Sequence, residues 1–84
     1  MKPNEIFALI LTKVFGVQAK FKKVGDVYKT FSTPQKYVFN PAEQIITYFK
    51  PITVIQGGRY VKEVVLEMFK INDDNNGHLS VTRM

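Results

Sequence analysis

The sequence predicts a small α+β domain in which an antiparallel sheet of β-hairpins packs against two α-helices, in the approximate order α-β-β-(β)-α-β-β-β. Three observations predict it: an apolar stretch bounded by Pro3 and Gly16, a strongly capped segment that begins at Asn40, and β-branched segments joined by Gly-Gly and Asn-Gly turns. The 84 residues contain no linker-like stretch, so residues 1–84 are expected to form a single domain.

Residues 4–15 are expected to form the first helix, which begins near Pro3 and ends at Gly16. From Ile6 onward only Thr12 and Lys13 are polar, and a helix that is apolar nearly all round must be buried on more than one side. The helix therefore either lies across the sheet under flanking loops or is shared with a second subunit. For a shared helix, the predicted interface residues are Ile6, Phe7, Ile10, Leu11 and Val14.

Residues 18–32 fit two interpretations. Gly25 and Asp26 between two valines form a two-residue hairpin turn, with Gly25 suited to a positive φ. The apolar spacing of four and three also fits a helix, in which Gly25 would cost about 1 kcal/mol. The Phe, Val, Tyr and Thr content favours the hairpin.

Residues 40–50 are expected to form the second helix. Asn40 is a favourable N-cap, Pro41 suits the first helical position, and Glu43 completes a start like a capping box. Pro51 prevents continuation. The apolar face of this helix would consist of Ala42, Ile45, Ile46 and Phe49.

The remaining residues are expected to form strands and turns. The predicted elements are a turn at 32–35, an extended segment at 36–39, and strands at 52–55, 59–71 and 78–83. A Gly57-Gly58 turn and the polar stretch 72–77 connect the last three. A helix over 60–71 is the alternative for the second of these strands; the strand is preferred because its hairpin partner is adjacent in sequence.

The net charge of +5 is concentrated in the first half of the chain. Residues 1–42 carry seven lysines against two acidic residues, whereas residues 43–84 carry five basic and five acidic residues. A local excess of positive charge attracts polyanions such as nucleic acid. The alternative is that the charge serves solubility.

The densest group of lysines surrounds the predicted hairpin. Its register places Lys22 directly opposite Lys29 and Lys23 opposite Tyr28. Lysines interleaved with aromatic side chains suit single-stranded nucleic acid, because bases stack on the rings and lysines contact phosphates. One alternative assigns the aromatic residues of the hairpin to the core. If residues 18–32 instead form a helix, its basic face would suit a duplex groove or an acidic protein. The predicted binding residues for nucleic acid or an anionic partner are Lys20, Lys22, Lys23, Tyr28, Lys29, Lys36 and Arg59.

The sequence offers little for catalysis or metal binding. There is no cysteine and His78 is the one histidine, which excludes a Cys/His nucleophile pair and a multi-histidine metal site. Glu63 and Glu67 are expected to lie on a solvated face, and the stretch 72–77 lacks the spacing of a calcium loop. We therefore expect no enzyme activity, no cofactor and no metal.

These observations predict a small basic protein that binds nucleic acid through its lysine-rich hairpin. The alternative is a protein-interaction module, such as a small inhibitor, adaptor or assembly factor of a viral or plasmid accessory kind, which binds an acidic protein or self-associates as a homodimer through its first helix. The apolar run at residues 6–11 is too short to cross a bilayer, and no signal peptide is expected. We expect a cytoplasmic protein with no membrane partner.

Overall fold

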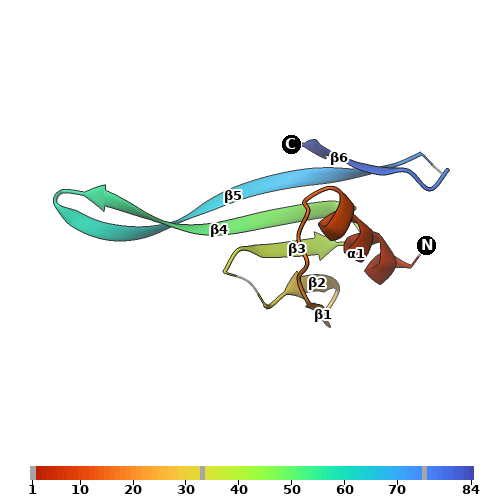
Figure 1. Cartoon of the computed structure of the whole chain (residues 1–84), viewed down its shortest axis with the longest axis horizontal. Coiled ribbons are helices and arrows are strands. Elements are labelled where there is room, and N and C mark those ends of the chain that lie inside the picture. The colour runs from red at the N-terminus through yellow and green to blue at the C-terminus, as the bar shows by residue number, and fades with distance from the viewer. Residues whose placement is uncertain (1, 33, 75) are drawn as a thin grey trace.

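The structure, a computed structural model, describes residues 2–32, 34–74 and 76–84. Over these residues the chain forms one helix followed by six strands that make one antiparallel sheet in sequence order (Figure 1). The elements are α1 (Pro3–Lys13), β1 (Phe21–Val24), β2 (Val27–Thr30), β3 (Lys36–Asn40), β4 (Ile45–Gln56), β5 (Arg59–Asp73) and β6 (Leu79–Arg83).

The prediction of an α+β fold with two helices is wrong, because the described chain is mainly β and the expected second helix at 40–50 does not form. The side-chain oxygen of Asn40 does accept hydrogen bonds from the N–H groups of Ala42 (3.1 Å) and Glu43 (3.3 Å), as an N-cap would. The chain then turns back at Gln44, which adopts a φ of 55°. The β-branched and aromatic residues 45–49 pair with β3 on one side and β5 on the other, and this pairing outweighs the local cap.

The hairpin and strand predictions are confirmed. Residues 18–32 form β1 and β2 with the predicted register, and Gly25 in the turn has a φ of 62°. The expected strands at 36–39, 52–55 and 59–71 lie within β3, β4 and β5, and the expected strand at 78–83 becomes β6, which begins one residue later at Leu79. The alternative helix over 60–71 is therefore wrong. Thr33 in the predicted turn 32–35 and Asn75 in the polar stretch 72–77 lie outside the described residues.

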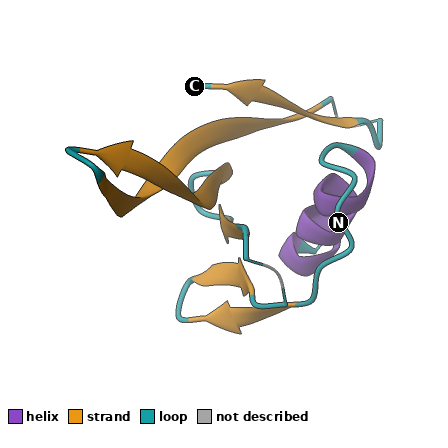
Figure 2. Ribbon diagram, turned by 60° about the vertical axis from the view of Figure 1, so that its left-hand side comes forward, coloured by secondary structure: helices purple, strands orange, loops and turns teal. Residues whose placement is uncertain are grey.

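Helix α1 lies on one face of the sheet, which curves around it (Figure 2). Gly16, with a φ of 66°, reverses the chain after the helix, and the N–H of Val17 donates to the carbonyl of Leu11 at 2.7 Å. The buried core joins three helical side chains to side chains from β3, β4 and β5. Its members are Phe7, Ile10, Leu11, Tyr37, Phe39, Ile46 and Ile71.

Residues that face each other across the ladders share a side of the sheet, which defines two faces. We call the side that carries Phe39, Ile46 and Ile71 the covered face, because these residues pack against α1. We call the other side the open face. It carries Lys22, Lys29, Lys36 and Phe49, which are related by the ladder register.

Strands β4 and β5 are much longer than the rest of the sheet. Pairing of β4 with β3 ends at Phe49, and pairing of β5 with β6 starts at Phe69. Residues 50–65 therefore form a two-stranded ribbon, which we call the arm. It gives the molecule extents of 52 × 23 × 22 Å and projects to one side in Figure 1.

Candidate functional site

Three lysines lie on adjacent strands of the open face. Lys22 on β1 is directly opposite Lys29 on β2, and Lys29 is opposite Val38 on β3. Lys36 precedes Val38 by two residues and so points to the same side. The alternation of the strands thus aligns three ammonium groups across β1, β2 and β3.

An exposed aromatic residue lies among these lysines. Phe31 follows β2 directly, has 54% of its surface exposed, and its ring centroid is 5.7 Å from the Nζ of Lys22. That separation is within the range of a cation–π contact. The lysines and Phe31 line a shallow depression of about 440 Å³. Its lining is Lys22, Lys29, Thr30, Phe31, Lys36, Val38 and Phe49.

A second depression continues the first toward the arm. It has a volume of about 320 Å³ and is lined by Pro34, Lys36, Phe49, Pro51 and Val64. Because Lys36 and Phe49 line both depressions, they form one groove, which we call the open-face groove. The groove is basic at the β1 end and apolar at the arm.

The open face is uniformly positive. At the described strand positions of this face the charged residues are all lysines, and none is acidic. They are Lys22, Lys29, Lys36, Lys62 and Lys70. The acidic residues of β5 point to the covered face, because they occupy odd-numbered positions and side chains alternate along a strand. They are Glu63, Glu67 and Asp73. The open face therefore carries charges of one sign, which creates a field that attracts anions.

Three of the sequence-predicted binding residues, Lys23, Tyr28 and Arg59, lie away from the open face. Lys23 is opposite Tyr28 on the covered face. The Tyr28 ring is half-buried and stacks on Phe39 with centroids 6.3 Å apart, so it contributes to the core. The carbonyl of Lys20 accepts a hydrogen bond from the N–H of Phe31 at 3.0 Å, but Lys20 does not line the groove and instead lines the pocket between α1 and the segment that leads to β1.

Sequence reasoning missed the two aromatic residues of the groove. Phe31 was assigned to the core in the alternative interpretation of the hairpin and was not among the predicted binding residues, and Phe49 was placed on the second helix. The alternation of side chains along a strand could have identified Phe31. Phe31 follows Lys29 by two residues, so an extended chain places both side chains on the same face of the sheet. Arg59, the remaining predicted residue, lies at the tip of the arm, far from β1 and β2 (Figure 1).

The predicted interface on α1 is mostly internal. Phe7, Ile10 and Leu11 are at most 2% exposed and form the core of the domain itself. Ile6 packs against that core, and Val14 is partly exposed. The predicted alternative in which α1 lies across a sheet accounts for the burial of Phe7, Ile10 and Leu11, so these three side chains are not available to a second subunit.

The described residues provide no cluster of His, Asp or Glu side chains that could hold a metal ion. Glu67 forms an ion pair with Arg83 at 2.9 Å, and Glu63 accepts a hydrogen bond from the amide of Gln56 at 3.0 Å. Burial, followed by the neighbouring Tyr48 hydroxyl, raises the pKa of Tyr37 above its ordinary value of 10.0. None of these groups faces the open-face groove.

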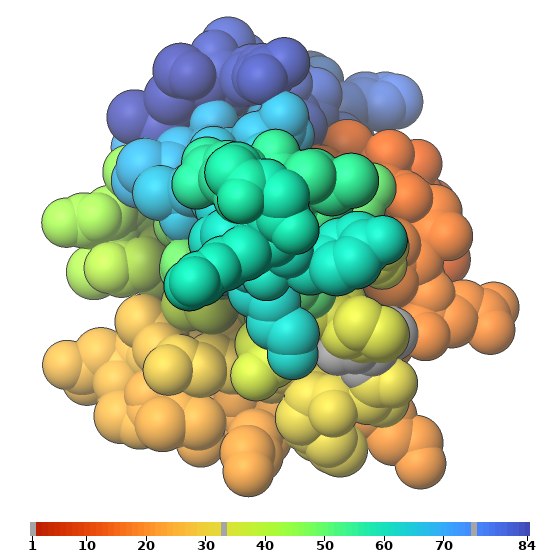
Figure 3. All heavy atoms as spheres, turned by 90° about the vertical axis from the view of Figure 1, so that its left-hand side faces the viewer, coloured from red at the N-terminus to blue at the C-terminus, as the bar shows by residue number. Residues whose placement is uncertain are grey.

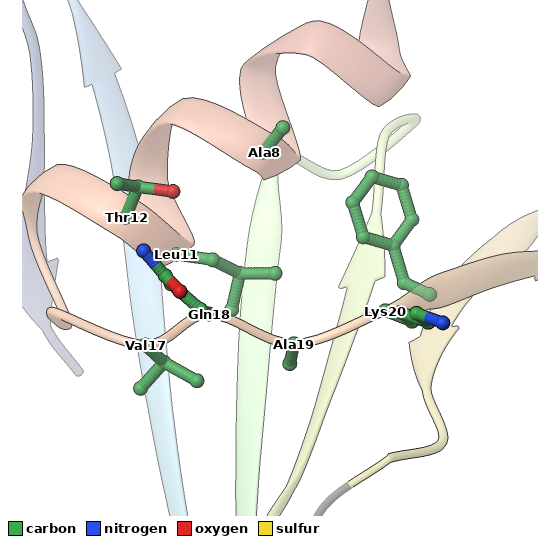
Figure 4. A pocket seen from close by; sticks show the side chains of 8 residues that line it. Ala8, Leu11, Thr12, Val17, Gln18, Ala19 and Lys20 are labelled. Atoms are coloured by element: carbon green, nitrogen blue, oxygen red, sulfur yellow. The ribbon is translucent and has the colours of Figure 1, made fainter.

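A pocket of about 420 Å³ lies between α1 and the segment that leads to β1 (Figure 4). Its polar lining consists of Thr12, Gln18 and Lys20, and the rest of the lining is apolar. A hydroxyl, an amide and an ammonium group do not form a nucleophile–base pair of the kind that hydrolytic sites use. We therefore place the candidate site on the open face.

No protein-family model, curated protein or solved structure matches this chain. In the part of the chain that the structure describes, no helix has the length and apolar character needed to cross a membrane.

Proposed function

We propose that this chain is a cytoplasmic, non-catalytic protein that binds single-stranded nucleic acid in the open-face groove. One observation carries the proposal: Lys22, Lys29 and Lys36 lie on adjacent strands around the exposed ring of Phe31, on a face whose described strand positions hold no acidic residue. Lysines that follow a backbone and a ring on which a base can stack are the two components of non-specific single-strand binding.

The shape of the groove favours a single strand over a duplex. The groove is a shallow surface across four strands, β1 to β4, where splayed bases can reach Phe31 and Phe49. A duplex shields its bases in a stack and would use the phosphate contacts alone. Stacking contributes about 1–3 kcal/mol per base, so the two rings favour the single strand.

A second candidate is an acidic protein segment with apolar side chains. The observation in its favour is the apolar end of the groove, where Phe49, Pro51 and Val64 continue the surface beyond the lysines. Such a segment would place carboxylates at the lysines and apolar side chains at the arm.

The test measures the affinity of the protein for labelled single-stranded DNA, single-stranded RNA and duplex DNA at several salt concentrations. The proposal expects single-strand binding with a log–log salt slope of about −2, since three neutralised phosphates contribute about 0.7 each. The triple variant Lys22→Gln, Lys29→Gln, Lys36→Gln should abolish binding.

The matched control removes the same charge away from the groove, at Lys13, Lys23 and Lys50. This control variant should keep most of the affinity and the salt slope. Absence of binding at low salt, or an equal loss in the two triple variants, would refute the proposal and favour the acidic protein segment.

A further inference from the structure

The arm leaves two strand edges unpaired. Over residues 50–65 the described ladders join β4 only to β5, so each strand has one hydrogen-bonded neighbour. Two-stranded ribbons are marginal in water, and an unpaired edge is a template for another strand. The arm also exposes apolar side chains, including Ile55 (69%), Tyr60 (82%) and Val64 (62%). Figure 3 looks onto this arm end, whose tip projects in front of the rest of the molecule.

The two edges differ in their capacity to pair. The β4 edge contains Pro51, and a proline in a strand turns its missing N–H toward the unpaired side. The same edge carries Lys50 directly before the proline, which also discourages pairing. The β5 edge from Arg59 to Val65 contains no proline. Edge-to-edge association of the arm should therefore use β5.

We propose that β5 pairs with β5 of a second copy of this chain, antiparallel, about a twofold axis at Val61. In this register Arg59 lies opposite the partner's Glu63, and the symmetry repeats the pair. Tyr60 lies opposite the partner's Lys62, which allows a cation–π contact on the open face. Each charged residue of the segment thus meets an opposite charge or an aromatic ring, and the two arms form a four-stranded sheet.

Neighbouring registers lack this complementarity. Moving the axis by one residue toward Val65 places Lys62 opposite its own copy, and moving it by two places Glu63 opposite its own copy. Moving it by one residue toward the turn places Tyr60 opposite its own copy and loses both the Arg59–Glu63 and the Tyr60–Lys62 pairs. Like charges directly opposite each other destabilise a sheet. The sequence of the edge therefore selects a second copy as the partner and Val61 as the centre.

A disulfide experiment tests the axis directly, because the chain contains no cysteine. In the variant Val61→Cys the two new thiols face each other across the axis, at a spacing that suits a disulfide. The variant should become a covalent dimer in oxidised glutathione. The control is Val54→Cys, since Val54 is the ladder partner of Val61, is also half-buried, and lies on the β4 edge. It should stay monomeric under the same conditions.

A charge-swap series tests the register without cysteine. Arg59→Glu and Glu63→Arg should each weaken the dimer by roughly tenfold in sedimentation or light scattering, because each removes two opposite-charge pairs and adds repulsion. The double variant should restore the original affinity. Lys50→Glu on the β4 edge is the control and should not weaken the dimer.

Three results would overturn the proposal. One is equal crosslinking of the two cysteine variants, and another is failure of the double variant to restore association. The third is a protein that stays monomeric at high concentration and associates only when an oligonucleotide is added, which would assign the arm to nucleic acid.

Discussion

Lys22 and Lys29 are directly opposed across the β1–β2 hairpin, on the side of the sheet that α1 does not cover. Like charges at directly opposed positions destabilise a sheet, and Lys36 adds a third positive charge on the same side. An anion bound in the open-face groove would attract all three lysines and so offset their mutual repulsion. The pair therefore costs stability in the free protein and gains it in a complex, as functional sites commonly do.

This relationship predicts opposite effects of one substitution on stability and binding. Lys22→Glu places a carboxylate opposite Lys29 and should stabilise the fold by about 0.5 kcal/mol, measured by denaturant unfolding at low salt. The same variant should bind single-stranded nucleic acid about tenfold more weakly. Lys23→Glu, opposite Tyr28 on the covered face, serves as the control for charge alone. Equal loss of binding in the two variants would contradict the groove.

The exposed ring of Phe31 predicts a loss of affinity with little loss of stability. Phe31→Ala should weaken single-strand binding by about 1–3 kcal/mol, the contribution of one stacked base. Leu66→Ala is a matched control, since Leu66 is 55% exposed against 54% for Phe31 and lies on the same face. The control should bind normally, as measured by fluorescence anisotropy. An unchanged affinity in Phe31→Ala would rule out stacking at this position.

The burial of Tyr37 predicts a loss of stability in alkali. Because burial raises the pKa of Tyr37 above 10.0, the unfolded chain releases this proton at a lower pH than the folded protein. Stability is therefore complete below about pH 10 and falls as the pH rises toward the folded pKa. Tyr37→Phe should reduce this fall in urea unfolding from pH 8 to 11. The control Tyr60→Phe, at the exposed tip, leaves Tyr37 in place. Its stability should therefore decrease with rising pH as much as that of the wild-type protein.

Most strands could be predicted because their signals are local. The β1–β2 register follows from Gly25 and Asp26 between two valines, and it was predicted pair by pair. The arm follows from the β-branched run at 52–55 and the turn at Gly57 and Gly58. In these places the turn residues and the strand propensities favour the same structure.

The second helix was mispredicted because local and tertiary preferences disagree. The cap at Asn40 forms its two hydrogen bonds, but residues 45–49 are paired on both sides by strands that are distant in sequence or separated by a turn. The same error concealed the groove, since Phe49 reaches the open face only as part of β4. The position of the lysines could thus be predicted from the register of the β1–β2 hairpin. The position of Phe49 could not, because it depends on the pairing of β4 with its neighbouring strands.

The turn that replaces the predicted helix supplies the last prediction. Gln44 has a φ of 55°, a region that costs most side chains about 1 kcal/mol and glycine almost nothing. Its carbonyl accepts a hydrogen bond from the N–H of Ile71 at 2.9 Å, so this residue of the turn between β3 and β4 is fixed to β5. Gln44→Gly keeps this backbone bond and should stabilise the fold by about 0.5–1 kcal/mol, a rise in melting temperature of roughly 2–8 °C.

The control is Gln18→Gly, at an exposed position where φ is not positive. There the added freedom acts only on the unfolded chain, so stability should fall by about 0.4–1 kcal/mol. Opposite signs for the same substitution at the two glutamines would show that the turn at Gln44 stores strain. This strain is sustained because the strand pairing of residues 45–49 contributes more free energy than the turn costs. A destabilised Gln44→Gly variant would mean that the Gln44 side chain contributes more than its backbone strain costs.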